Sequence, residues 1–388
     1  MTSKNLSTRA SKLSPFHVMD ILAQAKAMTL QGETVHHLEI GEPDFATADC
    51  IIQSGIRALQ QCKTHYTSAL GLPELRHAIA EYYDRKFSVT VDPERIVVTP
   101  GASGAIQLAI SCLLDAGDNV LLSDPGYPCN RNITQVLASE AIAIPTDADN
   151  FYQLTSDLVD KHWNEKTRAA IVATPSNPTG TIMPAQQLKA LCQAVEEKQG
   201  CLIVDEIYQG LVYDSDEYTA LEISDECFVI NSFSKYFGMT GWRVGWMVVP
   251  EFYVDAIDRI AQNIFLAPPT ISQYAAITAL ETETQFVLDE RRDQFKKRRD
   301  FLLPVLEQLG FKIAAKPRGA FYIYANCENF TDDSYPWVKQ LLSNQGVALA
   351  PGIDFGDYLA EKHCRFAYTQ PVDILEQAVE KIAAFVKR

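Results

Sequence analysis

Short apolar runs alternate with helix-like segments along the middle of the chain. The runs are rich in β-branched residues, and they span residues 96–99, 120–123, 170–174, 202–204, 229–232 and 244–249. This alternation predicts an α/β architecture with a mostly parallel sheet covered by helices.

The two ends of the chain follow a different pattern. Apolar residues recur at helical spacing over 18–28, and a short strand precedes the turn at 40–44. Beyond residue 268, helical stretches at 271–280, 286–309 and 374–382 alternate with strand-like pieces at 320–324, 347–350 and 365–368. We expect a large domain over 46–282 and a smaller α+β domain over 283–388, with 1–45 as an N-terminal segment joining the small domain.

Composition and charge narrow the classes of partner. The 388 residues suffice for two or three domains at about 150 residues each. The chain carries 34 Lys and Arg against 49 Asp and Glu, a formal net charge of −15. Nucleic acid and anionic membranes are therefore not expected as partners, because both attract basic surfaces. The basic run at 291–299 is interpreted as a solvated helix face.

The cysteines and the N-terminal residues favour a cytoplasmic protein. Nine cysteines are scattered without a Cys-x-x-Cys pair, which predicts reduced thiols and neither a disulfide framework nor a zinc site. No secretory signal is visible near the start. Residues 96–114 carry no charge, but their Pro, Gly and hydroxyl residues predict a strand, a tight loop and a helix rather than a membrane span.

Polar turns follow several of the predicted strands. Ligands of open α/β sheets bind beyond the carboxyl ends of the strands, so these turns should converge on one pocket. One turn places Lys235 directly after an apolar run, together with Ser232 and Ser234, and Arg243 follows eight residues later. Lys235 by itself could be an ordinary surface lysine, but the serines and the arginine near it favour a functional lysine. The turns are 101–103, 124–127, 177–180, 205–208 and 232–235.

Together these motifs resemble the pyridoxal-phosphate-dependent aminotransferases of class I and II, in the fold-type-I superfamily. The resemblance covers essentially the whole chain and keeps the family's order. It implies an aspartate-aminotransferase-like fold with a mostly parallel seven-stranded sheet, pyridoxal 5′-phosphate as cofactor, and ping-pong transfer of an amino group from an L-amino acid to a 2-oxo acid. Its motifs are Ile40-Gly41-Glu42-Pro43, Tyr66 with residues 71–76, Asn177-Pro178-Thr179-Gly180, Asp205-Glu206-Ile207-Tyr208, the Ser-x-Ser-Lys loop with Arg243, and Arg365.

The resemblance assigns the reacting groups. The amine of Lys235 would form a Schiff base with the cofactor aldehyde and, once displaced, carry the proton of the substrate Cα. Asp205 would face the protonated pyridine nitrogen, since an opposite charge keeps that proton bound. Tyr208 and Asn177 would bond the phenolic oxygen of the cofactor. Without Lys235, a helix cap would be the simpler interpretation of Asp205.

The cofactor phosphate has its own set of matching residues. Gly101, Ala102 and Ser103 open a predicted helix, whose free N–H groups and dipole favour an anion. Arg243 would add a bidentate cation, and Ser232 a hydroxyl donor. A serine considered by itself is more often only the cap of a helix or a turn.

The remaining matches concern the ring, the substrate and the assembly. Tyr127 would stack on the cofactor ring. Arg365 would clamp the substrate carboxylate, with Gly41 and Asn177 beside it, because its planar fork suits that group. Tyr66 would reach the cofactor of the neighbouring subunit, which implies a homodimer.

The resemblance leaves the substrate open. The prokaryotic aspartate branch carries a lysine where this chain has Ser103, which weakens aspartate or glutamate as donors without excluding them. A cysteine-S-conjugate β-lyase shares the fold and every motif, and release of pyruvate and ammonia would distinguish it. A non-catalytic regulatory module is disfavoured, because Lys235 is intact and the net charge does not suit DNA. We predict an amino-acid aminotransferase of undetermined side-chain preference.

Overall fold

A computed structural model describes residues 6–387. Its main sheet contains β2 (Ile96–Thr99), β3 (Asn119–Asp124), β4 (Glu140–Pro145), β5 (Thr167–Ala173), β6 (Cys201–Asp205), β7 (Phe228–Ser232) and β8 (Gly245–Val248). The seven strands follow the order β2-β8-β7-β6-β5-β3-β4. Neighbours are parallel except for β8, which is antiparallel to β2 and β7. The predicted mostly parallel seven-stranded sheet is confirmed.

Helices cover both faces of this sheet because its strands are apolar on both sides. They are α3 (Asp49–Gln60), α4 (Pro73–Phe87), α5 (Gly101–Leu113), α6 (Pro128–Val136), α7 (Ser156–His162), α8 (Ala185–Glu197), α9 (Val254–Ile264) and α10 (Thr270–Ala279). Successive residues of a strand point to opposite faces. Val98 and Val172 therefore share one core with α4 and α8, whereas Val97 and Ile171 share another with α5 and α9.

The edge strand β4 has no counterpart among the predicted runs. Its residues are exposed or half-buried, apart from Ile144. β4 is partly exposed, so its sequence lacks the dense β-branched run of β5 or β6. β2, the strand at the other edge of the sheet, is fully buried and was predicted. Apolar density therefore follows the burial of a strand rather than its place in the sheet.

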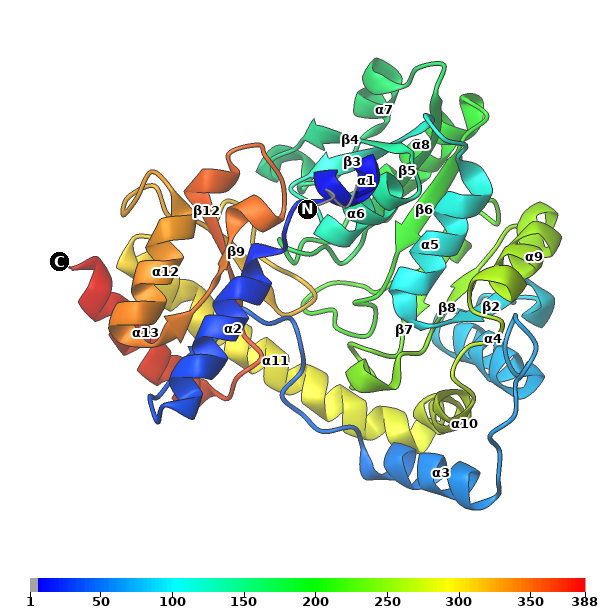
Figure 1. The fold of residues 1–388 in the computed structure, drawn as a ribbon, viewed down its shortest axis with the longest axis horizontal. Coiled ribbons are helices and arrows are strands. Elements are labelled where there is room, and N and C mark those ends of the chain that lie inside the picture. Colours follow the sequence, from blue (N-terminus) through cyan, green and yellow to red (C-terminus); the bar gives the residue numbers. More distant parts are fainter. Residues whose placement is uncertain (1–5, 388) are drawn as a thin grey trace, which may run out of the picture.

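Both ends of the chain contribute to a second group of elements. Its strands are β1 (His36–His37), parallel to β10 (Val347–Ala348), and β11 (Ala350–Pro351), β12 (His363–Ala367) and β9 (Tyr322–Asn326), which form an antiparallel sheet. Its helices are α1 (Thr8–Lys12), α2 (His17–Leu30), α11 (Thr282–Leu309), α12 (Ser334–Gln345) and α13 (Val372–Val386). Figure 1 shows α2 from the start of the chain beside α12 from its end, and these two helices are in contact.

The long helix α11 joins this group to the main sheet region. In Figure 1 it runs from the side of α13 to α10. Gly310, with a left-handed φ of +105°, ends it. The boundaries at residues 45 and 282 stay predictions, and residues 1–5 of the N-terminal segment lie outside the described part. Within residues 6–387, no helix combines the length and the apolar character that crossing a bilayer requires.

Candidate active site

A cavity of about 610 Å³ lies where the carboxyl ends of the central strands face the segment after β1. Most of the residues that the sequence singled out line this cavity, although they come from separate turns. They are Gly41, Ala102, Ser103, Tyr127, Asn177, Asp205, Tyr208, Lys235, Arg243 and Arg365. A volume of this size suits a cofactor and a small substrate together.

Three predicted residues do not line the cavity. Gly101 lies just behind Ala102 at the start of α5. Ser232 is buried and donates a hydrogen bond to Ser234 Oγ (3.0 Å), and it is Ser234 that lines the cavity. Tyr66 lies in the loop between α3 and α4 with its side chain 81% exposed. Its predicted role therefore needs a second subunit.

Lys235 lies in the loop after β7, and its amine lies inside the cavity. Its Nζ donates a hydrogen bond to the carbonyl oxygen of Gly41 at 2.6 Å. Burial, aided by the guanidinium groups of Arg365 and Arg243, lowers the pKa of Lys235 to about 8. A useful fraction of the amine is therefore uncharged near neutral pH, as nucleophilic attack requires.

Asp205 is the last residue of β6, and its carboxyl is buried in the cavity wall. Its Oδ1 accepts a hydrogen bond from the N–H of Ile207 at 3.0 Å. Burial raises the pKa of Asp205 to about 6, so the group is mostly ionised at neutral pH. A buried carboxylate is costly without a partner, which favours a cationic group in the cavity beside it.

Two tyrosine hydroxyls meet at the edge of the cavity. The Oη atoms of Tyr208 and Tyr322 are 2.7 Å apart, and both side chains are buried. Burial raises the pKa of Tyr208 well above its usual value, and the Tyr322 hydroxyl adds to the rise. Both phenols therefore stay protonated and can donate hydrogen bonds. A Cβ at Gly41 would overlap Tyr322 Oη, so this approach requires glycine.

Arg365 on β12 brings a buried guanidinium to the opposite wall. It donates hydrogen bonds to Asn177 Oδ1 (2.9 Å) and to the carbonyl oxygen of Glu39 (2.6 Å), and both partners are neutral. The guanidinium lies over the rings of Tyr322 and Phe355, 4.2 and 4.8 Å from their centroids. Its Nε is buried without a partner among the described residues. This arrangement favours an anion such as a carboxylate.

The start of α5 and Arg243 form a cradle for a second anion. The first N–H groups of a helix lack partners within it, and its dipole favours negative charge there. Arg243 is adjacent, because a Cβ at Gly101 would lie 2.5 Å from its Nη2. Gly101 has a φ of +74°, so glycine suits both the turn and this close approach.

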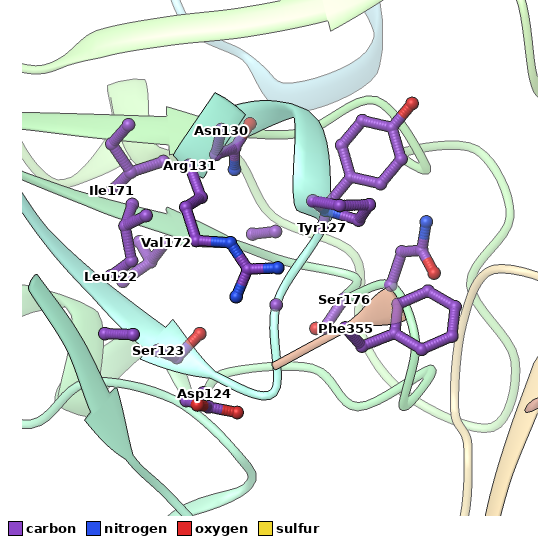
Figure 2. A pocket seen from close by; sticks show the side chains of 15 residues that line it. Leu122, Ser123, Asp124, Tyr127, Asn130, Arg131, Ile171, Val172, Ser176 and Phe355 are labelled. Atoms are coloured by element: carbon purple, nitrogen blue, oxygen red, sulfur yellow. The ribbon is translucent and has the colours of Figure 1, made fainter. Parts of the chain in front are cut away.

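A second, much smaller pocket shares Tyr127 and Asn177 with the cavity. In Figure 2 the Arg131 side chain reaches across it, and the rings of Tyr127 and Phe355 lie toward one end. Its volume of about 30 Å³ suits a water molecule rather than a cofactor. The cavity lined by Lys235, Asp205 and Arg365 is therefore the candidate active site.

Comparison with known proteins places this geometry in a family. The profile of the family described as "Aminotransferase class I and II" matches residues 33–382. The valine–pyruvate aminotransferase of Mycobacterium tuberculosis is 38% identical, over 96% of both chains. The aspartate aminotransferase of Bacillus subtilis is 30% identical, over 99% of both. The crystal structure of an aminotransferase from Mycobacterium tuberculosis matches with a TM-score of 0.96 at 36% identity, covering 99% of this chain and 100% of that one. This chain belongs to the class I and II aminotransferases.

Aminotransferases of class I and II depend on pyridoxal phosphate, and this cavity fits that cofactor. The cofactor has an aldehyde, a ring nitrogen that can carry a proton, and a phosphate. This aminotransferase offers a buried amine at Lys235, a buried carboxylate at Asp205, and the anion cradle at Arg243. Each reactive part of the cofactor thus has a protein group of complementary chemistry in this cavity.

Sequence reasoning missed Tyr322 in this aminotransferase. Tyr322 belongs to an apolar, aromatic run in β9, which is most simply interpreted as core. The one signal was Gly41, whose lack of a side chain admits the Tyr322 hydroxyl. A glycine cannot by itself identify the group that approaches it.

Proposed function

We propose that this aminotransferase exchanges the amino group of an L-amino acid with a 2-oxo acid in two half-reactions, with Lys235 as the reacting amine. One observation carries the proposal: the buried amine, its pKa lowered to about 8, shares a cavity with the Asp205 carboxylate and the Arg365 guanidinium. Burying three charged groups costs stability, so catalysis is the better explanation of their meeting.

The chain's residues divide the chemistry among them. Bound pyridoxal phosphate supplies the electron sink for the negative charge left on the substrate Cα. Asp205 holds a proton on the ring nitrogen by its opposite charge. Lys235 would take the proton from Cα as general base and, as general acid, deliver it to the C4′ carbon of the cofactor. Tyr208 and Asn177 provide hydrogen bonds for the phenolic oxygen.

The other residues bind and orient. Arg365 fixes the substrate carboxylate next to Gly41, so that the Cα–H bond faces Lys235. Ala102, Ser103 and the Arg243 guanidinium hold the phosphate, and Tyr127 stacks on the ring. Gly101 supplies the tight turn of the cradle, and Ser232 positions Ser234 through their hydrogen bond.

The visible absorption spectrum of the purified protein tests this proposal. With pyridoxal phosphate bound, we expect a band that fades on addition of suitable amino acids and returns with a 2-oxo acid. Absence of a band after cofactor addition would contradict the proposal. A persistent band, with pyruvate and ammonia accumulating from a cysteine conjugate, would instead identify a β-lyase.

We further propose that the enzyme is a homodimer in which Tyr66 reaches the partner's site. The match of Tyr66 to the family position supports this, and its 81% exposure leaves the side chain free to reach a neighbouring subunit. Tyr66→Phe should weaken cofactor binding by about tenfold, the effect of losing one hydrogen bond to a charged group. Sedimentation measures the oligomeric state, and cofactor titration measures the affinity of the wild type and of Tyr66→Phe. A monomeric wild type, or full cofactor affinity in Tyr66→Phe, would refute the proposal.

The cytoplasmic location also stays a proposal. The nine cysteines, which form no Cys-x-x-Cys pair, support a reducing compartment. Cell fractionation with an antibody to the protein would test this location.

A further inference from the structure

One wall of the cavity has no task in the chemistry proposed above. The cofactor and the substrate carboxylate account for the polar side chains near Lys235 and Arg365. The substrate side chain is the one part of the reactants still without a surface. Most of the side chains left to face it are apolar, and they come from the start of α2, the segment after β1, and α5: Phe16, Val18, Met19, Ile40 and Ile106. The polar ones are Glu39, Glu42 and Thr240.

The part of this wall formed by α2 is held in place. The Asp354 carboxylate accepts hydrogen bonds from the N–H groups of His17 and Val18, each at 2.8 Å. Val18 is 3% exposed and clusters with Phe355, with Phe16 packed against them. A pre-organised apolar surface binds an apolar side chain without an ordering cost.

The charges around the cavity disfavour an acidic substrate side chain. The cations that line it, Lys235, Arg243 and Arg365, already have tasks. Two further lining residues without a task, Glu39 and Glu42, are carboxylates. Glu39 is fully buried; its Oε1 lies 2.8 Å from His37 Nδ1, and its Oε2 has no partner among the described residues. A second carboxylate on the substrate would lose its water and meet like charges.

A further cation, Arg131, lies in the small adjoining pocket rather than in the cavity wall. Figure 2 shows its side chain extending between Val172 and Leu122 on one side and Phe355 on the other. In the described structure it forms no ion pair that would hold it there, so its influence is best tested directly.

We propose that this site selects amino acids with uncharged, apolar side chains, together with the corresponding 2-oxo acids, and rejects dicarboxylic ones. The proposal rests on the proposed function, because it concerns the same site.

Binding of unreactive acids to the cofactor-loaded enzyme tests this selection apart from turnover. Calorimetry should show 4-methylpentanoate binding at least about tenfold more tightly than succinate, since apolar contacts favour the first and an unpaired charge disfavours the second. Tighter binding of succinate would overturn the proposal. So would a loss of succinate affinity in Arg131→Met with no loss of 4-methylpentanoate affinity, because Arg131 would then supply a cation to an acidic substrate side chain.

Single turnovers extend the test to reacting substrates. Mixed with the loaded enzyme, leucine and phenylalanine should bleach the cofactor band with a second-order rate constant at least about tenfold above those of aspartate, glutamate and lysine. Faster bleaching by a charged amino acid would overturn the selectivity while leaving the proposed function intact. Bleaching by none of them would instead remove the proposed function.

Met19 offers a matched pair of variants. It is 50% exposed, so a charge there is tolerated by the fold. Met19→Arg should shift the ratio of succinate to 4-methylpentanoate affinity toward succinate by about tenfold, and Met19→Gln, of similar length but neutral, should not. Equal ratios in the two variants would show that this wall does not face the substrate side chain.

Discussion

Replacing Lys235 by alanine should lower kcat by about a thousandfold or more, because one amine serves as nucleophile and as proton carrier. The fold should survive, since removing a buried amine also removes its desolvation cost. Stopped-flow assays of transamination measure the first effect, and circular dichroism with thermal melting measures the second. Undiminished turnover in this variant would show that another amine reacts.

Lys316→Ala is the matched control. Lys316 is 55% exposed and lies 3.8 Å from the Asp214 carboxylate, a surface pair that contributes little. Its removal should leave both rate and melting temperature unchanged.

In the wild type, capture of added pyridoxal phosphate by the cofactor-free enzyme should accelerate as the pH rises through about 8, because the Lys235 amine is neutral above its pKa.

Replacing Arg365 by alanine should raise KM for the amino acid about a hundredfold, while cofactor affinity stays nearly unchanged. A carboxylate held by two charged hydrogen bonds loses about 1.5–3 kcal/mol for each one removed. Arg365→Lys keeps the charge but not the planar fork, so its KM should lie between those of the wild type and Arg365→Ala. Steady-state kinetics and cofactor titration separate these effects. If Arg365→Ala lost cofactor and substrate equally, Arg365 would be a structural residue of the Asn177 loop.

The fold was predictable where burial leaves a strong pattern. β5 and β6 lie in the middle of the sheet with apolar neighbours on both faces, so their sequences are dense in β-branched residues. β4 is partly exposed and leaves a weaker pattern.

The site was predictable where chemistry and topology coincide. Lys235 and Asp205 are polar residues directly after apolar strands, and the sheet brings such positions together. Phe16 and Tyr322 could not be found in this way, because their contacts with the cavity depend on how elements from the chain's two ends pack around it. Tertiary packing of that kind leaves no local signal in a single sequence.

The hydrogen bond from Lys235 to Gly41 links the reacting amine to a segment from the other end of the chain. Lys235 and Thr240, both from the stretch after β7, bond Gly41 and Glu42, so two hydrogen bonds tether residues 39–42 to that stretch. A change of partner at the Lys235 amine should therefore also change the local stability of residues 39–42, a coupling that hydrogen exchange over these residues would record.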